Sequence, residues 1–227
     1  MPTRGRPDGL SRGLLAALPP QGRDAVLSAA RHRSFAVGER LVRQGEDALE
    51  LFLLNSGWAA VRLGTPRGDS VTLAVLCPGD VFGETGALNT RQQRTATVQA
   101  LDAVTTLVVR WDDLEVLRRS HPEVNDFLLA LLGRRIERLS RLVVEAHHLP
   151  AARRVARRLY ELGRQFAADG TSPLLPLSQE EVAQIAGTTR PTTNQVLKRL
   201  EADGVIALAR GRIELRNLPE LRSRCSW

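Results

Sequence analysis

Four residues between positions 83 and 95 have the types and the spacing needed to hold a sugar phosphate. Gly83 and Glu84 begin a tight segment, and Arg94 and Thr95 follow on a predicted strand, with the arginine ten residues after the glutamate. A guanidinium can donate two parallel hydrogen bonds to a phosphate, and the backbone N–H groups of a short turn add an anion-binding concavity. The carboxylate can accept a hydrogen bond from a ribose hydroxyl. These are the groups that a cyclic nucleotide requires.

The spacing of these residues resembles the phosphate-binding cassette of the cyclic nucleotide-binding domain. The resemblance implies that Gly83 and Glu84 face the ribose and the phosphate of the ligand. It further implies that Arg94 pairs with the cyclic phosphate and that Thr95 adds a hydroxyl or an N–H group to it. The alternative is a β-turn followed by a surface arginine, in a β-roll that binds no nucleotide.

The cassette must be positioned by the segment from Ser34 to Arg110, where short apolar runs are divided by glycines. Runs such as 51–54, 58–63 and 71–76 have the length of strands, and this pattern predicts a sandwich or a barrel. The ordered turns also resemble those of the cyclic nucleotide-binding β-roll: Gly38-Glu39, Gln44-Gly45-Glu46, Ser56-Gly57 and Pro78-Gly79-Asp80. Ahead of this segment, residues 1–9 predict a disordered tail, and residues 10–30 predict two short helices separated by Pro19-Pro20.

Residues 122–149 then predict one long helix, about 40 Å in length at 1.5 Å per residue. Residues that are apolar at every position but one recur at alternating spacings of four and three. They form a heptad seam, which Ile136 and Val143 widen. The seam consists of Leu128, Leu132, Arg135, Leu139, Leu142, Ala146 and Leu149. We expect it to pack on a symmetric partner helix, with packing along its own β-roll as the alternative. Pro150 ends the helix and is interpreted as a hinge.

The C-terminal third predicts two helices joined by a short turn. Residues 151–162 form an amphipathic helix, a loop covers 163–177, and Ser178 and Glu181 have capping-box spacing. A second helix opens near Pro191, because threonine can cap a helix and proline is tolerated in a first turn. Its polar groups are Thr188, Thr189, Arg190, Thr192, Thr193, Asn194, Gln195, Lys198 and Arg199. This arrangement is typical of a helix-turn-helix that enters the major groove, although a purely structural helical hairpin has the same outline.

A hairpin wing carrying Arg210 and Arg212 follows, with strands at 205–208 and 212–215. The formal net charge is +7, of which residues 1–120 contribute +2 and residues 121–227 contribute +5, as expected if the second half touches nucleic acid. Two distant cysteines, Cys77 and Cys225, exclude a disulfide framework and an iron–sulfur cluster. No apolar run approaches the length of a membrane span, and no catalytic or metal-ligand constellation is present.

From about residue 10 to 216 the chain resembles the CRP/FNR family of bacterial transcription regulators. The resemblance implies an α+β fold with a cyclic nucleotide-binding β-roll over 1–120, a dimerisation helix over 121–150 and a winged helix-turn-helix over 151–227. It implies that Arg190 reads a guanine, where a bidentate contact contributes about 1–3 kcal/mol of discrimination. Pro191 stands where the family often has a glutamate, and Gln195 where it often has a second arginine. We therefore expect the chain to recognise a DNA sequence that differs from the one recognised by family members with glutamate and arginine at these two positions.

Cyclic AMP is the effector that the family resemblance implies, with no metal. In the cyclic AMP-binding branch, two neighbouring hydroxyl residues of the dimerisation helix meet the adenine. The matching positions here are Leu139 and Ser140, so one hydroxyl is kept and one is lost. Arg135 lies one turn earlier on the seam, and we expect it to help meet the ligand.

The sequence thus predicts a cytoplasmic, homodimeric, sequence-specific DNA-binding transcription regulator under allosteric control by cyclic AMP, and not an enzyme. Its expected partners are double-stranded DNA, a second copy of the chain and RNA polymerase, with no membrane. One alternative is a family regulator that binds DNA without cyclic nucleotide, through a vestigial pocket or one for a different ligand. The other is a cyclic nucleotide-sensing module that acts through a protein partner.

Overall fold

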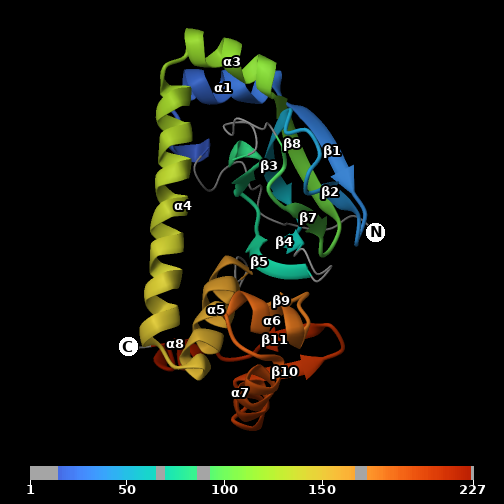
Figure 1. Ribbon diagram of the computed structural model, residues 1–227, viewed down its shortest axis with the longest axis vertical. Coiled ribbons are helices and arrows are strands. Elements are labelled where there is room, and N and C mark those ends of the chain that lie inside the picture. Colours follow the sequence, from blue (N-terminus) through green and yellow to red (C-terminus); the bar gives the residue numbers. More distant parts are fainter. Residues whose placement is uncertain (1–14, 65–69, 86–92, 167–172, 226–227) are drawn as a thin grey trace. The chain divides into compact units, whose positions relative to one another are not determined.

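The computed structural model describes residues 15–64, 70–85, 93–166 and 173–225 (Figure 1). The predicted tail at 1–9 lies outside these residues. The chain divides into two compact units, one comprising Met1–Ser70 and Ala74–Glu137, the other Val71–Leu73 and Arg138–Trp227. The long helix α4 (Glu123–His148) contributes to both units.

Among the described residues, two four-stranded sheets build the first unit, as the glycine-divided apolar runs predict. One sheet has the order β1-β8-β3-β6 and the other the order β2-β7-β4-β5. The strands are β1 (Arg31–Phe35), β2 (Arg40–Val42), β3 (Glu50–Ser56), β4 (Ala59–Gly64), β5 (Ser70–Leu76), β6 (Val81–Phe82), β7 (Thr97–Ala100) and β8 (Val104–Arg110). The helical elements are the 3-10 turn η2 (Leu15–Ala17), α1 (Pro20–Ala29), α3 (Trp111–Ser120) and α4. The predicted break at Pro19-Pro20 is confirmed, since α1 begins at Pro20.

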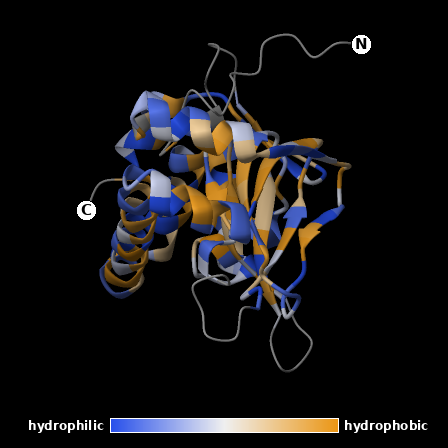
Figure 2. Ribbon diagram, turned by 90° about the horizontal axis from the view of Figure 1, so that it is seen from above, coloured by the Kyte–Doolittle hydropathy of each residue, from blue (hydrophilic) through white to orange (hydrophobic). Residues whose placement is uncertain are grey.

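Both faces of strand β3 are buried, which explains its nearly continuous apolar sequence. Phe52 and Leu54 point into the core between the two sheets, where Phe52 stacks on Phe82 with ring centroids 4.8 Å apart. Leu51 and Leu53 point the other way, into a second core made with α1, α3 and the first turns of α4. Figure 2 shows the result, with orange concentrated on the strands and both colours on the helices. The period of two thus fixes which side chains face the interior of the roll.

Helix α4 has 26 residues and lies within the predicted range 122–149, but its exposed apolar stripe differs in part from the predicted seam. Leu128 packs into the core beneath the β-roll and Leu149 is buried, so neither lies on an open stripe. The exposed large apolar side chains are those of Leu129, Ile136, Leu139, Val143 and Val144, with Leu132 half-buried. Positions 129, 132, 136, 139 and 143 repeat with spacings of three and four. This heptad stripe shares Leu132 and Leu139 with the predicted seam and includes Ile136 and Val143, while Leu129 takes the place of Leu128.

Besides the last turns of α4, the described residues of the second unit form four helices and a three-stranded sheet of order β10-β11-β9. Its elements are α5 (Ala151–Phe166), β9 (Leu174–Leu175), α6 (Gln179–Ile185), α7 (Arg190–Ala202), β10 (Ile206–Ala209), β11 (Arg212–Leu215) and α8 (Leu218–Ser223). The helix-turn-helix and the wing are confirmed. The loop predicted at 163–177 is wrong at both ends, because α5 continues to Phe166 and Leu175 pairs with Ile213. Helix α8 was not predicted.

Among the described residues, every helix is too short or too polar to cross a lipid bilayer.

Candidate functional site

Gly83 holds the cassette in a backbone conformation that side chains rarely adopt, with φ at +98° directly after β6. A Cβ atom there would lie 2.6 Å from Nη1 of Arg94 and 2.8 Å from the carbonyl oxygen of Glu50. Because both distances are below van der Waals contact, the turn and the arginine can approach only where no side chain stands between them. Nη1 of Arg94 in turn donates to the carbonyl of Gly83 at 3.4 Å. Glycine is therefore required at this position for the geometry of the pocket.

Arg94 is a buried cation, with 6 % of its surface exposed. Burial lowers the pKa of its guanidinium, and the carboxylates of Glu50, Glu46 and Glu84 oppose that shift. The guanidinium carbon lies 5.3 Å from the centroid of the Phe52 ring, a cation–π contact. Its backbone is fixed as well, because its N–H donates to the carbonyl of Glu46 at 2.8 Å. A phosphate would replace the solvation that burial has removed from this cation.

Glu84 is a buried carboxylate in the same pocket, with 1 % of its surface exposed. Its Oε1 accepts a hydrogen bond from the hydroxyl of Thr85 at 2.9 Å. The same oxygen lies 3.4 Å from Nη1 of Arg135, which comes from α4 and is 43 % exposed. The predicted grouping of Glu84 with Arg135 is thus present, although through an ion pair that the sequence did not indicate.

One pocket brings together most of the residues predicted to hold a ligand. Its polar lining consists of Gly83, Glu84, Thr85, Arg94, Thr95 and Arg135, and its apolar lining of Val42, Val61, Phe82, Ala96 and Val98. Leu139 and Ser140 are not among the described residues that line this pocket. Both are exposed side chains one turn beyond Arg135 on α4. Their contact with a ligand stays a prediction.

The turn between α6 and α7 is built by local hydrogen bonds. Ser178 and Glu181 form the predicted capping box at the start of α6. Thr189 caps α7 by accepting from the N–H of Thr192 at 3.4 Å, and the two hydroxyls lie 2.9 Å apart. Gly187 between the helices has φ of +60°. Thr189 therefore has a structural role in addition to the DNA contact predicted for it.

Helix α7 presents its polar side chains on the face opposite its core contacts. Leu197, Leu200 and Thr193 are buried, and Thr193 is 0 % exposed. The expectation that Thr193 belongs to the exposed polar set is therefore wrong, because it lies on the buried face of α7 with Leu197 and Leu200. The predicted DNA-contacting residues on the exposed side are Arg190, Gln195 and Lys198, with Thr192 and Asn194 half-buried. The amide oxygen of Asn194 is buried without a hydrogen-bond partner among the described residues.

The wing begins beside the start of α7. β10 and β11 are joined by the two-residue turn Arg210-Gly211, and Gly211 has φ of +69°. Arg190, Arg210 and Arg212 line one hollow of about 360 Å³ with the first residues of α6. Three cations predicted from separate segments thus converge on one surface of the unit.

Two arginines on the other flank of α7 were not predicted as site residues. Arg153 of α5 and Arg199 of α7 border a hollow of about 510 Å³, beside Thr192 and Gln195. Arg224 also borders it but is paired with Asp203 at 2.6 Å and with Glu220 at 2.9 Å. Within the described part of the chain, no carboxylate lies within 4.0 Å of Arg153 or Arg199. Arg199 was noticed as a polar group of the helix, whereas nothing in the sequence singles out Arg153 among its neighbours.

Comparison with known proteins identifies both units. Residues 32–121 match the cyclic nucleotide-binding domain family, and residues 153–224 match the Crp-like helix-turn-helix domain family. The cyclic AMP receptor protein of Thermus thermophilus is 33% identical over 203 residues, which cover 89% of this chain and 92% of that protein.

Two solved structures have the same fold. A putative cAMP-binding regulatory protein from Silicibacter pomeroyi superposes with a TM-score of 0.70 at 26% identity, over 96% of this chain and 97% of that one. The c-di-GMP-responsive regulator CLP of Xanthomonas campestris superposes with a TM-score of 0.71 at 20% identity, over 87% and 99% of the two chains. At that identity the second likeness concerns the fold alone.

Proposed function

The chain belongs to the CRP/FNR family of DNA-binding transcription regulators, and we propose that it acts as a homodimer whose affinity for DNA is controlled by cyclic AMP. The observation that carries this proposal is the pocket in which the buried Arg94 lies against Gly83 and shares its walls with the buried Glu84. A buried cation and a buried carboxylate in one small pocket suit a ligand that has both an anionic group and hydroxyl donors.

In the proposed complex the two charged side chains divide the ligand between them. Arg94 holds the cyclic phosphate with the fork of its guanidinium, helped by the N–H groups of the turn after Gly83 and by Thr95. Glu84 accepts a hydrogen bond from the ribose hydroxyl. Cyclic AMP is favoured because the Thermus thermophilus relative is a cyclic AMP receptor protein. Ser140 supplies the hydroxyl retained for the adenine.

Dimerisation is proposed through the exposed stripe of α4. Leu129, Ile136, Leu139 and Val143 are each more than half exposed, with Ile136 at 64 %. A heptad stripe of this kind is stabilised when the same stripe of a second copy covers it. Leu139 would then lie inside the dimer seam rather than against the ligand.

DNA recognition is proposed for α7, the wing and the flanking arginines. Arg190 would read a guanine, while Pro191 offers no acceptor for a cytosine amino group. Gln195 suits an adenine or a phosphate. Arg153 and Arg199 would contact the phosphate backbone beside the groove, because neither has a carboxylate partner among the described residues.

Control by the ligand would pass through the ion pair of Glu84 with Arg135. Because Arg135 stands on α4, a ligand that changes this contact also biases the position of α4 in the dimer. The response would set the two recognition helices about 34 Å apart, the distance between successive major grooves. RNA polymerase as a partner and a cytoplasmic location are part of the same proposal, and they rest on the family resemblance alone.

Calorimetric titration with cyclic AMP and cyclic GMP, in parallel with binding to a pool of random duplexes, tests this proposal. Micromolar or tighter binding of cyclic AMP together with stronger DNA binding is the expected result. Selective DNA enrichment without heat from either nucleotide would keep the regulator and overturn the proposed effector. Nucleotide binding without DNA enrichment would favour a sensing module that acts through a protein partner.

A second candidate keeps the family but changes the ligand. Leu139 stands where the cyclic AMP-binding branch has a hydroxyl, so the contact with the base is weakened at one position. The Xanthomonas campestris regulator of the same fold responds to c-di-GMP. Titration with cyclic di-GMP under the same conditions distinguishes this candidate from the first.

A further inference from the structure

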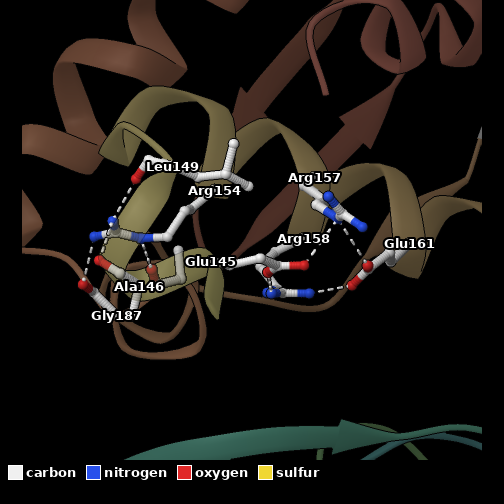
Figure 3. A network of polar contacts seen from close by, with 9 residues as sticks. Glu145, Ala146, Leu149, Arg154, Arg157, Arg158, Glu161 and Gly187 are labelled. Carbon is white, nitrogen blue, oxygen red and sulfur yellow. Dashed lines mark hydrogen bonds and ion pairs between the residues drawn. The ribbon is translucent and has the colours of Figure 1, made fainter. Parts of the chain in front are cut away.

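The guanidinium of Arg154 donates hydrogen bonds to backbone carbonyls at the C-terminal ends of two helices in the second unit, α4 and α6. Arg154 of α5 donates from Nη1 to the carbonyl of Leu149 at 2.7 Å, directly after the end of α4 (Figure 3). It donates from Nε to the carbonyl of Ala186 and from Nη2 to that of Gly187, each at 2.9 Å. Ala186 is the C-cap of α6, and Gly187 lies in the turn that leads into α7. Helix ends leave carbonyl groups without partners, and here one side chain satisfies carbonyls at both.

A second set of contacts, between charged side chains, joins α4 to α5. Glu145, on the last turns of α4, is 0 % exposed. Its Oε1 lies 3.0 Å from Nε of Arg157, and its Oε2 accepts a hydrogen bond from Arg158. Glu161 accepts from both arginines, at 3.4 Å from Nε of Arg157 (Figure 3). Two carboxylates therefore balance two guanidiniums, and the buried Glu145 cannot leave this set without exposing a charge to an apolar environment.

The bond from Arg154 to Leu149 and the contacts of Glu145 cross Pro150, the position interpreted from the sequence as a hinge. Glu145 lies before the proline, while Arg154, Arg157 and Arg158 lie after it. All of these residues belong to the second unit, in which the last turns of α4 and the helix-turn-helix form one compact body. A rotation at Pro150 would break the bond from Arg154 to the carbonyl of Leu149 and separate Glu145 from both arginines, while the bonds of Arg154 to Ala186 and Gly187 would move with the second half of the unit.

We propose that Arg154, supported by Glu145, is a positioning residue that fixes the recognition helix α7 relative to the last turns of α4 across Pro150. The inference rests on the proposed function, because the position of α7 matters only if α4 forms the dimer and α7 reads DNA. In that dimer, Arg154 sets the distance from the dimer axis to each recognition helix. It thereby determines which spacing between two DNA half-sites the protein accepts.

The fork of arginine is essential to this role. Its nitrogens lie in one plane and donate in fixed directions, so they reach the carbonyls of Leu149, Ala186 and Gly187 at once. A lysine ammonium is a point charge on a flexible chain and cannot hold all three in the same geometry. Arg154→Lys therefore keeps the charge of the domain while it loosens the link between α4 and α7.

Binding to duplexes with two half-sites, in which the spacer varies in steps of one base pair, tests the proposal. The half-site is first taken from the random pool enriched by the wild-type protein. We expect the wild type to prefer one spacer by about tenfold over its neighbours, since half-site spacing is set by the geometry of the dimer. Arg154→Lys should reduce that preference to about threefold or less, and Glu145→Gln should reduce it in the same direction. Arg164→Lys, an exposed arginine in the last turn of the same helix α5 and outside the network, serves as the control that keeps the wild-type preference.

The ratio between spacers separates positioning from general instability. A merely destabilised variant loses affinity for all spacers by the same factor, so its preference stays at the wild-type value. An Arg154→Lys protein that folds, binds and retains the wild-type ratio would overturn the positioning role. A wild-type protein that binds single half-sites with no preferred spacing would overturn the proposed dimer, and the positioning role with it.

Discussion

Two buried carboxylates of this chain, Glu84 and Glu145, have different surroundings. Glu145 lies between two guanidiniums, one of them in a direct hydrogen bond and the other 3.0 Å away. Glu84 accepts from the neighbouring hydroxyl of Thr85, and its arginine partner is 3.4 Å away and partly exposed. Both carboxylates have 1 % or less of their surface exposed.

The difference shows which buried charge is available for binding. Glu145 has its charge balanced within the protein, which suits a group that holds two helices together. Glu84 stands in a pocket beside the buried Arg94, whose pKa is lowered by burial. Burying charges that are only partly compensated opposes folding, and such groups are concentrated at functional sites. The comparison therefore assigns stability to Glu145 and supports the proposed ligand contact of Glu84.

The largest expected effect is the loss of free energy of unfolding when Glu145 is replaced. Glu145→Ala leaves the buried Arg158 without its hydrogen-bonded carboxylate, and breaking a buried pair in this way costs about 3–5 kcal/mol. Glu84→Ala should cost about 1 kcal/mol, as for the loss of an ordinary hydrogen bond. Urea unfolding of the two variants measures both values. Equal losses would contradict the division between the two carboxylates.

The next effect concerns the affinity for cyclic AMP. Arg94→Gln removes the charge that we propose to hold the phosphate, and a loss of about 100-fold, or roughly 2.7 kcal/mol, is expected for a charge-assisted bidentate contact. Calorimetric titration measures it. Arg43→Gln, which removes an exposed arginine of the same roll, is the matched control and should bind as the wild type does. Full affinity in Arg94→Gln would remove Arg94 from the site.

Gly83→Ala should show a smaller effect on the same site. The methyl group enforces φ near +98° on a side-chain residue, a strain of about 1–3 kcal/mol, and it also meets Nη1 of Arg94. Gly45→Ala isolates the strain, because Gly45 has φ of +86° and open space around the position of a Cβ atom. Unfolding stability should fall in both variants, whereas affinity for cyclic AMP should fall only in Gly83→Ala. A normal affinity in Gly83→Ala would show that the close approach is not required.

A moderate effect is expected at the DNA surface, where charges are unpaired rather than balanced. Arg153→Gln should lower the slope of log affinity against log salt by about 0.9, the value for one phosphate contact, without changing sequence preference. Arg216→Gln removes the same charge from an arginine that is paired with Glu214 at 3.1 Å, and it controls for net charge. Identical slopes in the two variants would exclude Arg153 from the interface.

The smallest effect concerns a group whose burial keeps it neutral. Desolvation raises the pKa of the Cys225 thiol from 9.0 to about 11. Because the folded-state pKa is raised, its contribution to stability is fully present below pH 9 and is lost as the pH rises to about 11. Alkylation of Cys225 at pH 8, followed by mass spectrometry, should be slower in the folded protein than in urea. Equal rates would contradict the raised pKa.

The elements with strong local signals could be predicted from the sequence. The apolar runs of the roll, the capping box at Ser178 and the cap at Thr189 are each determined by neighbouring residues, and all are present. Strand β9 was missed because two residues give no periodicity, and Leu174-Leu175 forms a strand only by pairing with β11. The seam of α4 was displaced because Leu128 and Leu129 fit a heptad equally well. Only the packing of the roll decides between them.

The contacts between distant residues could not be predicted. Gly83, Glu84, Arg94 and Thr95 were found because a known spacing joins them, and their place in one pocket follows that spacing. Nothing in the sequence joins Glu145 to Arg158 across a proline, or Arg154 to Gly187. Thr193 was misjudged because residue type indicates an exposed side chain, whereas helix phase places it in the core.

The most direct test of the account is the affinity for one selected duplex, measured with and without saturating cyclic AMP, in the wild type and in Arg94→Gln. The account predicts that cyclic AMP raises the affinity of the wild type by at least about tenfold, or about 1.4 kcal/mol of coupling. It predicts no change in Arg94→Gln, which should bind DNA as the nucleotide-free wild type does. A wild-type affinity that ignores cyclic AMP, or an equal response in Arg94→Gln, would contradict it.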